Sequence, residues 1–174
     1  MENHPAVVRL ETWSEQDAPL LSALNAPELM THLGGPETEE KLADRHRRYV
    51  ALCARPPSEG RMFRIVLLPE GAAAGGIGFW AREWEGEEVY EAGWAVLAAF
   101  QGRGVATAAA RAVVAEARAA GLRRHLHAFP SVDNPASNAV CRGAGFELLG
   151  PRDFEYPPGR PIRCNDWRFD LRGP

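Results

Sequence analysis

The sequence lacks the features that mark nucleic-acid-binding, membrane or exported proteins. Lys and Arg number 20 against 23 Asp and Glu, and basic residues form no run. A protein that binds nucleic acid or an anionic membrane surface usually has such a basic excess. The first ten residues show no signal pattern, and no apolar stretch approaches the roughly 20 residues of a membrane span. We therefore expect a cytoplasmic protein without nucleic-acid or membrane partners.

Residues that hold metals or build disulfide frameworks are also scarce. Cys53, Cys141 and Cys164 are an odd number at wide spacing, and they form no CxxC pair. The five histidines form no HxxxH or HExxH pattern, although His125 and His127 are spaced to share one face of a strand. We interpret the cysteines as reduced, small apolar residues and the histidines as structural, and we predict no metal site.

The size and patterning predict one domain that spans residues 1–174. Hydrophobic residues make up 45% of the chain and charged residues 25%, the balance of a globular protein. Capping residues, glycines and prolines divide the chain into segments with helical or strand periodicity. We predict strands at 6–13, 62–68, 75–84, 89–97, 124–130, 147–156 and 163–171, and helices at 14–25, 38–54, 105–120 and 136–144.

The element order βααβββαβαββ predicts an α/β (α+β) fold with a mixed central sheet of about seven strands and helices on both faces. Short links, such as the acidic turn at 85–88, join the early strands, which are therefore antiparallel. The unit of strand 89–97, helix 105–120 and strand 124–130 requires a right-handed parallel crossover.

The turn between strand 89–97 and helix 105–120 predicts a phosphate site. A helix N-terminus presents unpaired N–H groups and a partial positive charge. Gly102 and Gly104 let an anion approach the backbone, and Arg103 can add a charge-assisted contact. The turn is not a Walker loop, since no Gly-Lys-Ser/Thr follows. It is not a GxGxxG fingerprint either, since Thr107 occupies the third glycine position.

Two motifs resemble those of the GCN5-related N-acetyltransferases (GNAT superfamily). The segment 101–106, QGRGVA, matches Q/R-x-x-G-x-G/A, and the segment 134–138, NPASN, followed by Gly145-Phe146, matches the second motif of the superfamily. The element order agrees over nearly the whole chain. The N-P-x-S-N sequence and the late Glu155-Tyr156 are most similar to the branch of the ribosomal-protein alanine N-acetyltransferases.

The resemblance implies acetyl-CoA as cosubstrate and a gap between splayed fourth and fifth strands that admits the pantetheine arm. A bulge in the fourth strand would let the backbone of Trp94, Ala95 and Val96 bond to pantetheine or the thioester oxygen. Asn134, Ser137 and Asn138 would contact the cofactor from the second motif. The pyrophosphate would lie on Gln101, Gly102, Arg103, Gly104, Val105, Ala106 and Thr107.

The resemblance also suggests catalytic groups, and the alternatives stay open. Glu91 or Glu155 is a candidate base for the protonated amine, although either can be a solvated or ion-paired surface acid. Ser137 is a candidate for protonating the leaving thiolate, but it can equally cap a helix. Many relatives place a Tyr where this chain has Cys141, which we interpret as a space-filling residue.

We expect the acceptor to be a primary amine, either of a small molecule or of a peptide N-terminus. The intact phosphate turn also fits a different class of protein, a non-catalytic acyl-CoA-binding sensor or scaffold. Association into a homodimer is left open.

Overall fold

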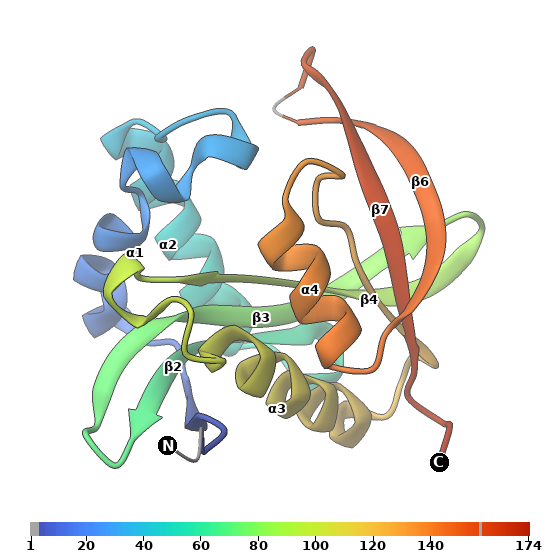
Figure 1. Cartoon of the computed structure of the whole chain (residues 1–174), viewed down its shortest axis with the longest axis horizontal. Coiled ribbons are helices and arrows are strands. Elements are labelled where there is room, and N and C mark those ends of the chain that lie inside the picture. Colours follow the sequence, from blue (N-terminus) through green and yellow to red (C-terminus); the bar gives the residue numbers. More distant parts are fainter. Residues whose placement is uncertain (1–3, 157) are drawn as a thin grey trace.

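The computed structural model describes residues 4–156 and 158–174. Its strands form one mixed sheet in the order β1-β2-β3-β4-β5-β7-β6 (Figure 1), which confirms the predicted fold class. The strands are β1 (Val7–Thr12), β2 (Gly60–Leu68), β3 (Ala72–Trp84), β4 (Glu87–Val96), β5 (His125–Ala128), β6 (Glu147–Glu155) and β7 (Pro161–Asp170).

The helices begin close to the capping residues that the sequence indicates. Ser14 and Asp17 form a capping box, and Thr38 accepts a hydrogen bond from the backbone N–H of Lys41 at the start of the second helix. The helices are α1 (Ala18–Leu24), α2 (Glu39–Cys53), α3 (Val105–Ala120) and α4 (Pro135–Gly143). Short 3₁₀ helices lie at Glu15–Asp17, Pro27–Leu29, Thr31–Leu33, Pro57–Glu59 and Ala98–Phe100.

Helices cover both faces of the sheet, as predicted. On one face α3 packs into the main core with the side chains of β2, β3 and β4, and α4 adds the buried Cys141 to the same core. On the other face Trp13, Leu21 and Met62 form a second cluster with residues of α2. Figure 1 shows α3 along one side of the sheet and α1 and α2 at the other. Among the described residues, no helix is both long and apolar enough to cross a membrane.

The β3–β4 hairpin is tighter than the sequence suggests. Its turn consists of Glu85 (φ 48°) and Gly86 (φ 80°), so both central residues have the positive φ of a type I′ turn. The Cα partners then run without a shift from Trp84–Glu87 to Gly75–Val96. The expected bulge in the fourth strand is therefore wrong. Glycines on β3 explain the close pairing, because a Cβ at Gly75 would lie 2.1 Å from the carbonyl oxygen of Ala95.

The fourth and fifth strands part early, as expected. Their parallel pairing is limited to Tyr90 with Leu126 and Glu91 with His127. Beyond that pair β4 continues to Val96 along β3, while β5 ends at Ala128 and pairs with β7 on its other side. The β5-facing edge of β4 is therefore unpaired between Ala92 and Val96, and this edge borders the gap.

Candidate active site

The turn before α3 leaves its backbone open to a ligand. Gly102 and Gly104 have φ values of 72° and 76°, in the left-handed region that favours glycine. A Cβ built on either residue would meet nothing within 4 Å. The space in front of this backbone is therefore free, because neither glycine has a side chain that would occupy it.

The start of α3 has no group of its own that competes with an anion. Gly104 is the N-cap and supplies no side chain, and the first turn contains no acidic residue. The backbone N–H of Ala108 is the first to bond inside the helix, at 3.0 Å from the Gly104 carbonyl oxygen. The N–H groups of Val105, Ala106 and Thr107 belong to the unpaired first turn and carry the positive end of the helix dipole.

Gln101 and Arg103 have different tasks in this turn. The Gln101 side chain donates from Nε2 to the carbonyl oxygen of Val96 at 3.0 Å, which ties the turn to the end of β4. Arg103 lies over the ring of Phe100 and pairs with Glu70 at 3.6 Å, with both charged side chains about half exposed. Such exposed pairs contribute little, so the Arg103 guanidinium can turn toward a phosphate.

The edge of β4 supplies N–H groups to the gap at alternate residues. The N–H of Leu97 bonds to the carbonyl oxygen of Ala74, so it points toward β3. Backbone groups alternate in direction along a regular antiparallel strand. The N–H groups of Trp94 and Val96 therefore point into the gap, and that of Ala95 points toward β3. The predicted contact of the Ala95 N–H is therefore wrong, whereas the contacts of the Trp94 and Val96 N–H groups with a ligand stay predictions.

The start of α4 is closed by its own side chains. Asn134 caps it, because its Oδ1 accepts from the backbone N–H of Ser137 at 3.1 Å and its Nδ2 donates to the Ser137 hydroxyl at 3.2 Å. The cap is therefore Asn134, and Ser137, which sequence reasoning considered as the cap, lies in the first turn. The Ser137 hydroxyl keeps its own proton for a ligand.

The side chain of Asn138 bonds entirely to other residues of the protein. Its amide nitrogen donates to two backbone carbonyl oxygens, those of Ser131 and Asn134, at 2.9 and 2.8 Å. Its oxygen accepts from the side chains of Asn165 and Trp167 at 2.9 and 2.8 Å. These four bonds use the full capacity of an amide. The residue predicted to contact the cofactor thus ties α4 to β7 and has no group left for a ligand.

Cys141 is sealed in the core and has no exposed surface. Burial raises the pKa of its thiol to about 12. A proton held this firmly, away from solvent, is unsuited to catalysis near neutral pH. The interpretation of Cys141 as a space-filling residue agrees with this setting.

The two candidate bases lie in different settings. The Glu91 carboxylate accepts from Arg82 at 2.6 Å and from the Trp80 indole N–H at 3.2 Å, so it is ion-paired on the face opposite α3. Glu155 lies at the end of β6, exposed, and accepts from the backbone N–H of Gly159 at 3.2 Å. Only Glu91 lies next to the inner end of the gap, since it belongs to the last β4–β5 pair.

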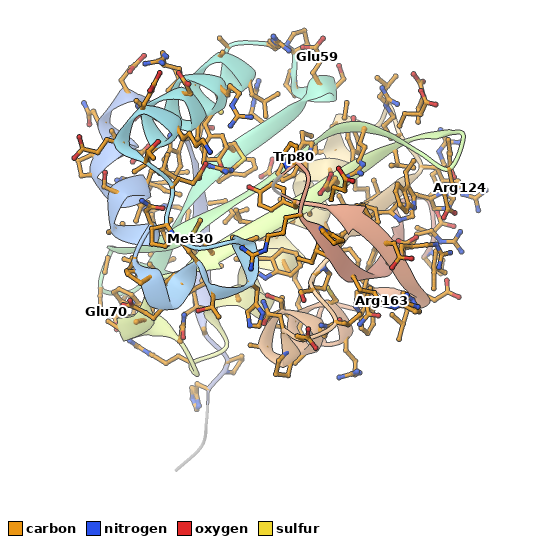
Figure 2. The ribbon with its side chains drawn as sticks, turned by 90° about the horizontal axis from the view of Figure 1, so that it is seen from above. Met30, Glu59, Glu70, Trp80, Arg124 and Arg163 are labelled. Atoms are coloured by element: carbon orange, nitrogen blue, oxygen red, sulfur yellow. The ribbon has the colours of Figure 1, made fainter. Side chains whose placement is uncertain are left out.

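Polar and aromatic groups surround Glu91, and the sequence alone did not show that they lie together. Arg82 lies over the rings of Trp84, Phe129 and Phe154, at 5.0 to 5.5 Å from their centres. Trp80 lies between α2 and the β6–β7 hairpin (Figure 2). Arg45 of α2 donates to the hydroxyl oxygen of Tyr156 at 3.1 Å.

These groups come from α2, β3, β6 and the residues just after β5 and β6. The sequence grouped only the nearby pair His125 and His127, on one face of β5. Within the described ranges, no group of three His, Cys, Asp or Glu side chains is arranged to hold a metal.

The comparison with protein-family models identifies the class. The model described as an acetyltransferase (GNAT) domain matches residues 8–147. The chain therefore belongs to the GNAT acetyltransferase family, and the resemblance seen in the two motifs is confirmed. A search of the curated proteins found no match.

Solved structures share the fold over almost the whole chain. An acetyltransferase from Salmonella typhimurium that modifies the N-terminal serine of ribosomal protein L7/L12 is 24% identical, with 94% of each chain covered and a TM-score of 0.77. A putative acetyltransferase from the same organism, with its cofactor acetyl-CoA, is 18% identical, with 96% and 95% covered and a TM-score of 0.74. An aminoglycoside acetyltransferase in complex with coenzyme A is 19% identical, with 94% and 95% covered and a TM-score of 0.73.

Proposed function

We propose that this protein transfers the acetyl group of acetyl-CoA to a primary amine by direct attack, without a covalent enzyme intermediate. The observation that carries the proposal is the uncapped N-terminus of α3 beside the unpaired edge of β4. The first suits a pyrophosphate and the second suits an amide-bearing arm, and coenzyme A joins the two. The similar solved structures that hold acetyl-CoA or coenzyme A support the same donor.

The donor would lie along the two open surfaces in order. Its pyrophosphate would accept from the backbone N–H groups at Gly102 to Thr107, and Arg103 would add charge. Pantetheine would follow the edge of β4 past the N–H groups of Val96 and Trp94. This places the thioester toward the inner end of the gap, next to Glu91.

The chemistry needs an electrostatic partner for the acyl oxygen and proton transfers at both ends. The carbonyl oxygen gains negative charge when the amine attacks, and a fixed N–H such as that of Trp94 would stabilise it. The Ser137 hydroxyl would donate a proton toward the leaving thiolate. Glu155, and Glu91 once freed from Arg82, remain proposed proton acceptors for the amine.

The acceptor would approach from the face that carries Trp80 and Glu91, between α2 and the β6–β7 hairpin. Similar solved proteins acetylate a protein N-terminus in one case and an aminoglycoside in another. We therefore propose an amine of a small molecule or a peptide N-terminus as acceptor. The similarity to the ribosomal-protein branch, with Ser137 and Glu155 in matching positions, favours the peptide.

Release of free thiol from acetyl-CoA, measured across a panel of peptides, polyamines, amino acids and aminoglycosides, tests the proposal. We expect at least one amine to give thiol and N-acetyl product in equal amounts. Tight binding of CoA without acetylation of any amine would contradict transfer and favour the sensor or scaffold.

A further inference from the structure

One row of side chains crosses the sheet at the inner end of the gap. The Cα register pairs Trp80 with Glu91, Glu91 with His127, and His127 with Arg168. Residues in register share a face, so His127 lies beside Glu91 on the face opposite α3. The neighbouring row, with Tyr90 and Leu126, faces the α3 core. His127 is therefore on the face where we place the acceptor, at the point where the strands part.

His127 is held by a fully buried carboxylate. Its Nδ1 lies 2.6 Å from Oδ1 of Asp166, which has no exposed surface, and the Trp84 indole N–H donates to the other oxygen at 3.0 Å. Burial acts to raise the pKa of Asp166, but the hydrogen bonds from His127 and Trp84 outweigh it and hold the pKa below its ordinary value. Asp166 is thus a carboxylate that only accepts, so Nδ1 carries the proton and Nε2 has the lone pair.

The free nitrogen of His127 is not sealed. The residue is 4% exposed, and its ring stacks on that of Phe129. Among the described residues, Nε2 of His127 has no hydrogen-bond partner, and it retains some contact with solvent. An orienting carboxylate on one nitrogen and an open lone pair on the other are what a general base requires.

We propose that Nε2 of His127, oriented by Asp166, takes the proton from the acceptor amine, directly or through one water molecule. This inference rests on the proposed function and changes one part of it, because His127, and not Glu91 or Glu155, then accepts the proton of the amine. Glu91 is the less suitable base, because Arg82 holds its carboxylate at 2.6 Å. Glu155 is exposed, on the end of β6 that pairs with Pro161, away from the last β4–β5 pair.

The proton balance closes with the groups that are present. The ammonium gives one proton to Nε2, and the neutral amine forms the N–C bond with the thioester carbonyl. The C–S bond then breaks and coenzyme A leaves as thiolate. The second proton of the attacking nitrogen goes to the thiolate, directly or by way of the Ser137 hydroxyl, and the imidazolium returns its proton to solvent.

Charged and titratable groups surround His127, and the ring of His125 on the same strand lies edge-on to it. The charged groups come from every strand packed around it: Asp166 and Arg168 of β7, Glu91 of β4, Arg82 of β3 and Arg152 of β6.

The chain contains a matched control. His125 lies two residues earlier on β5, and its Nδ1 is also 2.6 Å from a carboxylate, that of Glu87. We expect His127→Gln to lower kcat about 10²–10⁴-fold near pH 7 and to recover at high pH, where the amine is neutral without help. His125→Gln should keep nearly full activity. Affinity for CoA should be unchanged in both.

A weakly basic acceptor separates proton transfer from structure. Methoxyamine is neutral near pH 7 and needs no base, so its acetylation should survive His127→Gln. Equal loss with methoxyamine and with a basic amine would overturn the proposal, as would full activity of His127→Gln with a basic amine. If the wild-type protein acetylates no amine, the proposed function fails instead.

The protonation of each ring nitrogen of His127 can be measured in the wild-type protein without an acceptor. The inference therefore stays testable if His127→Gln does not fold. We expect ¹⁵N NMR of the wild-type protein to show that the neutral ring of His127 carries its proton on Nδ1 and a lone pair on Nε2. Protonation at Nε2 in the neutral ring would overturn the proposal.

Discussion

The parallel strands β4 and β5 each run into a helix, and the two helix starts differ. The start of α3 has a glycine cap, no capping side chain and no acid in its first turn. The start of α4 is filled by Asn134, whose side chain satisfies the N–H of Ser137. The start of α3 presents unpaired N–H groups, whereas at the start of α4 the N–H of Ser137 is already bonded to Asn134.

This difference indicates which of the two helix starts is better suited to bind the phosphates of a ligand. An anion gains most where N–H groups have no partner, and a capped helix offers it less. We therefore propose that the pyrophosphate binds at the start of α3, and that α4 contributes the Ser137 hydroxyl for the leaving sulfur.

The largest effect should come from placing a side chain at the uncapped N-terminus of α3. Gly104→Val puts a branched side chain in front of the N–H groups and strains a residue at φ 76°. Hydrogen bonds to charged groups contribute about 1.5–3 kcal/mol each, so CoA affinity should fall on the order of 100-fold. Isothermal titration with CoA measures it. Gly121→Val introduces the same residue at φ 73° beyond the other end of α3, so it strains the backbone in the same way and should keep CoA affinity. Unchanged affinity in a folded Gly104→Val protein would contradict the account.

Ser137→Ala tests what the hydroxyl in the first turn of α4 contributes to turnover. We expect turnover to fall about tenfold to a hundredfold, at the lower end for a general acid because a thiolate is a good leaving group. CoA affinity should be nearly unchanged, since the Asn134 bond to the Ser137 backbone remains. Steady-state kinetics with the best amine of the panel gives kcat, and normal kcat would remove Ser137 from the mechanism.

Removal of the Asn134 cap should lower stability without creating a second phosphate site at the start of α4. Asn134→Ala should cost about 1 kcal/mol of unfolding free energy, the usual value for a lost cap. Thr38→Ala removes the cap of α2 and is the matched control. If Asn134→Ala weakens CoA binding while Thr38→Ala does not, Asn134 contacts pantetheine, as the family resemblance implies.

The smallest effect on rate is expected at Cys141. Cys141→Ala removes one buried atom and should lower stability by about 1 kcal/mol, as small core truncations do. Chemical denaturation measures the change. Turnover should be unaffected, because the thiol is sealed and its pKa is about 12. A large loss of kcat at unchanged stability would show that the thiol, and not Ser137, serves the departing sulfur.

The glycine turn before α3 could be predicted from sequence, because Gly102 and Gly104 are local to it. The sequence also indicated the start of α4, but it pointed to Ser137 and not to Asn134 as a possible cap. The His127–Asp166 pair could not be predicted, because its members are 39 residues apart and meet through the β5–β7 register. The direction of the Ala95 N–H was wrong for a related reason. It depends on whether β4 has a bulge, which the glycines of β3 decide.

The measurement that tests the central claim most directly compares CoA with pantetheine, which lacks the pyrophosphate, in the wild-type protein and in Gly104→Val. If the open start of α3 holds the pyrophosphate, the wild-type protein should bind CoA far more tightly than pantetheine. That preference should largely disappear in Gly104→Val, while pantetheine affinity stays nearly the same. A wild-type protein that binds both alike, or a preference that survives Gly104→Val, would contradict the account.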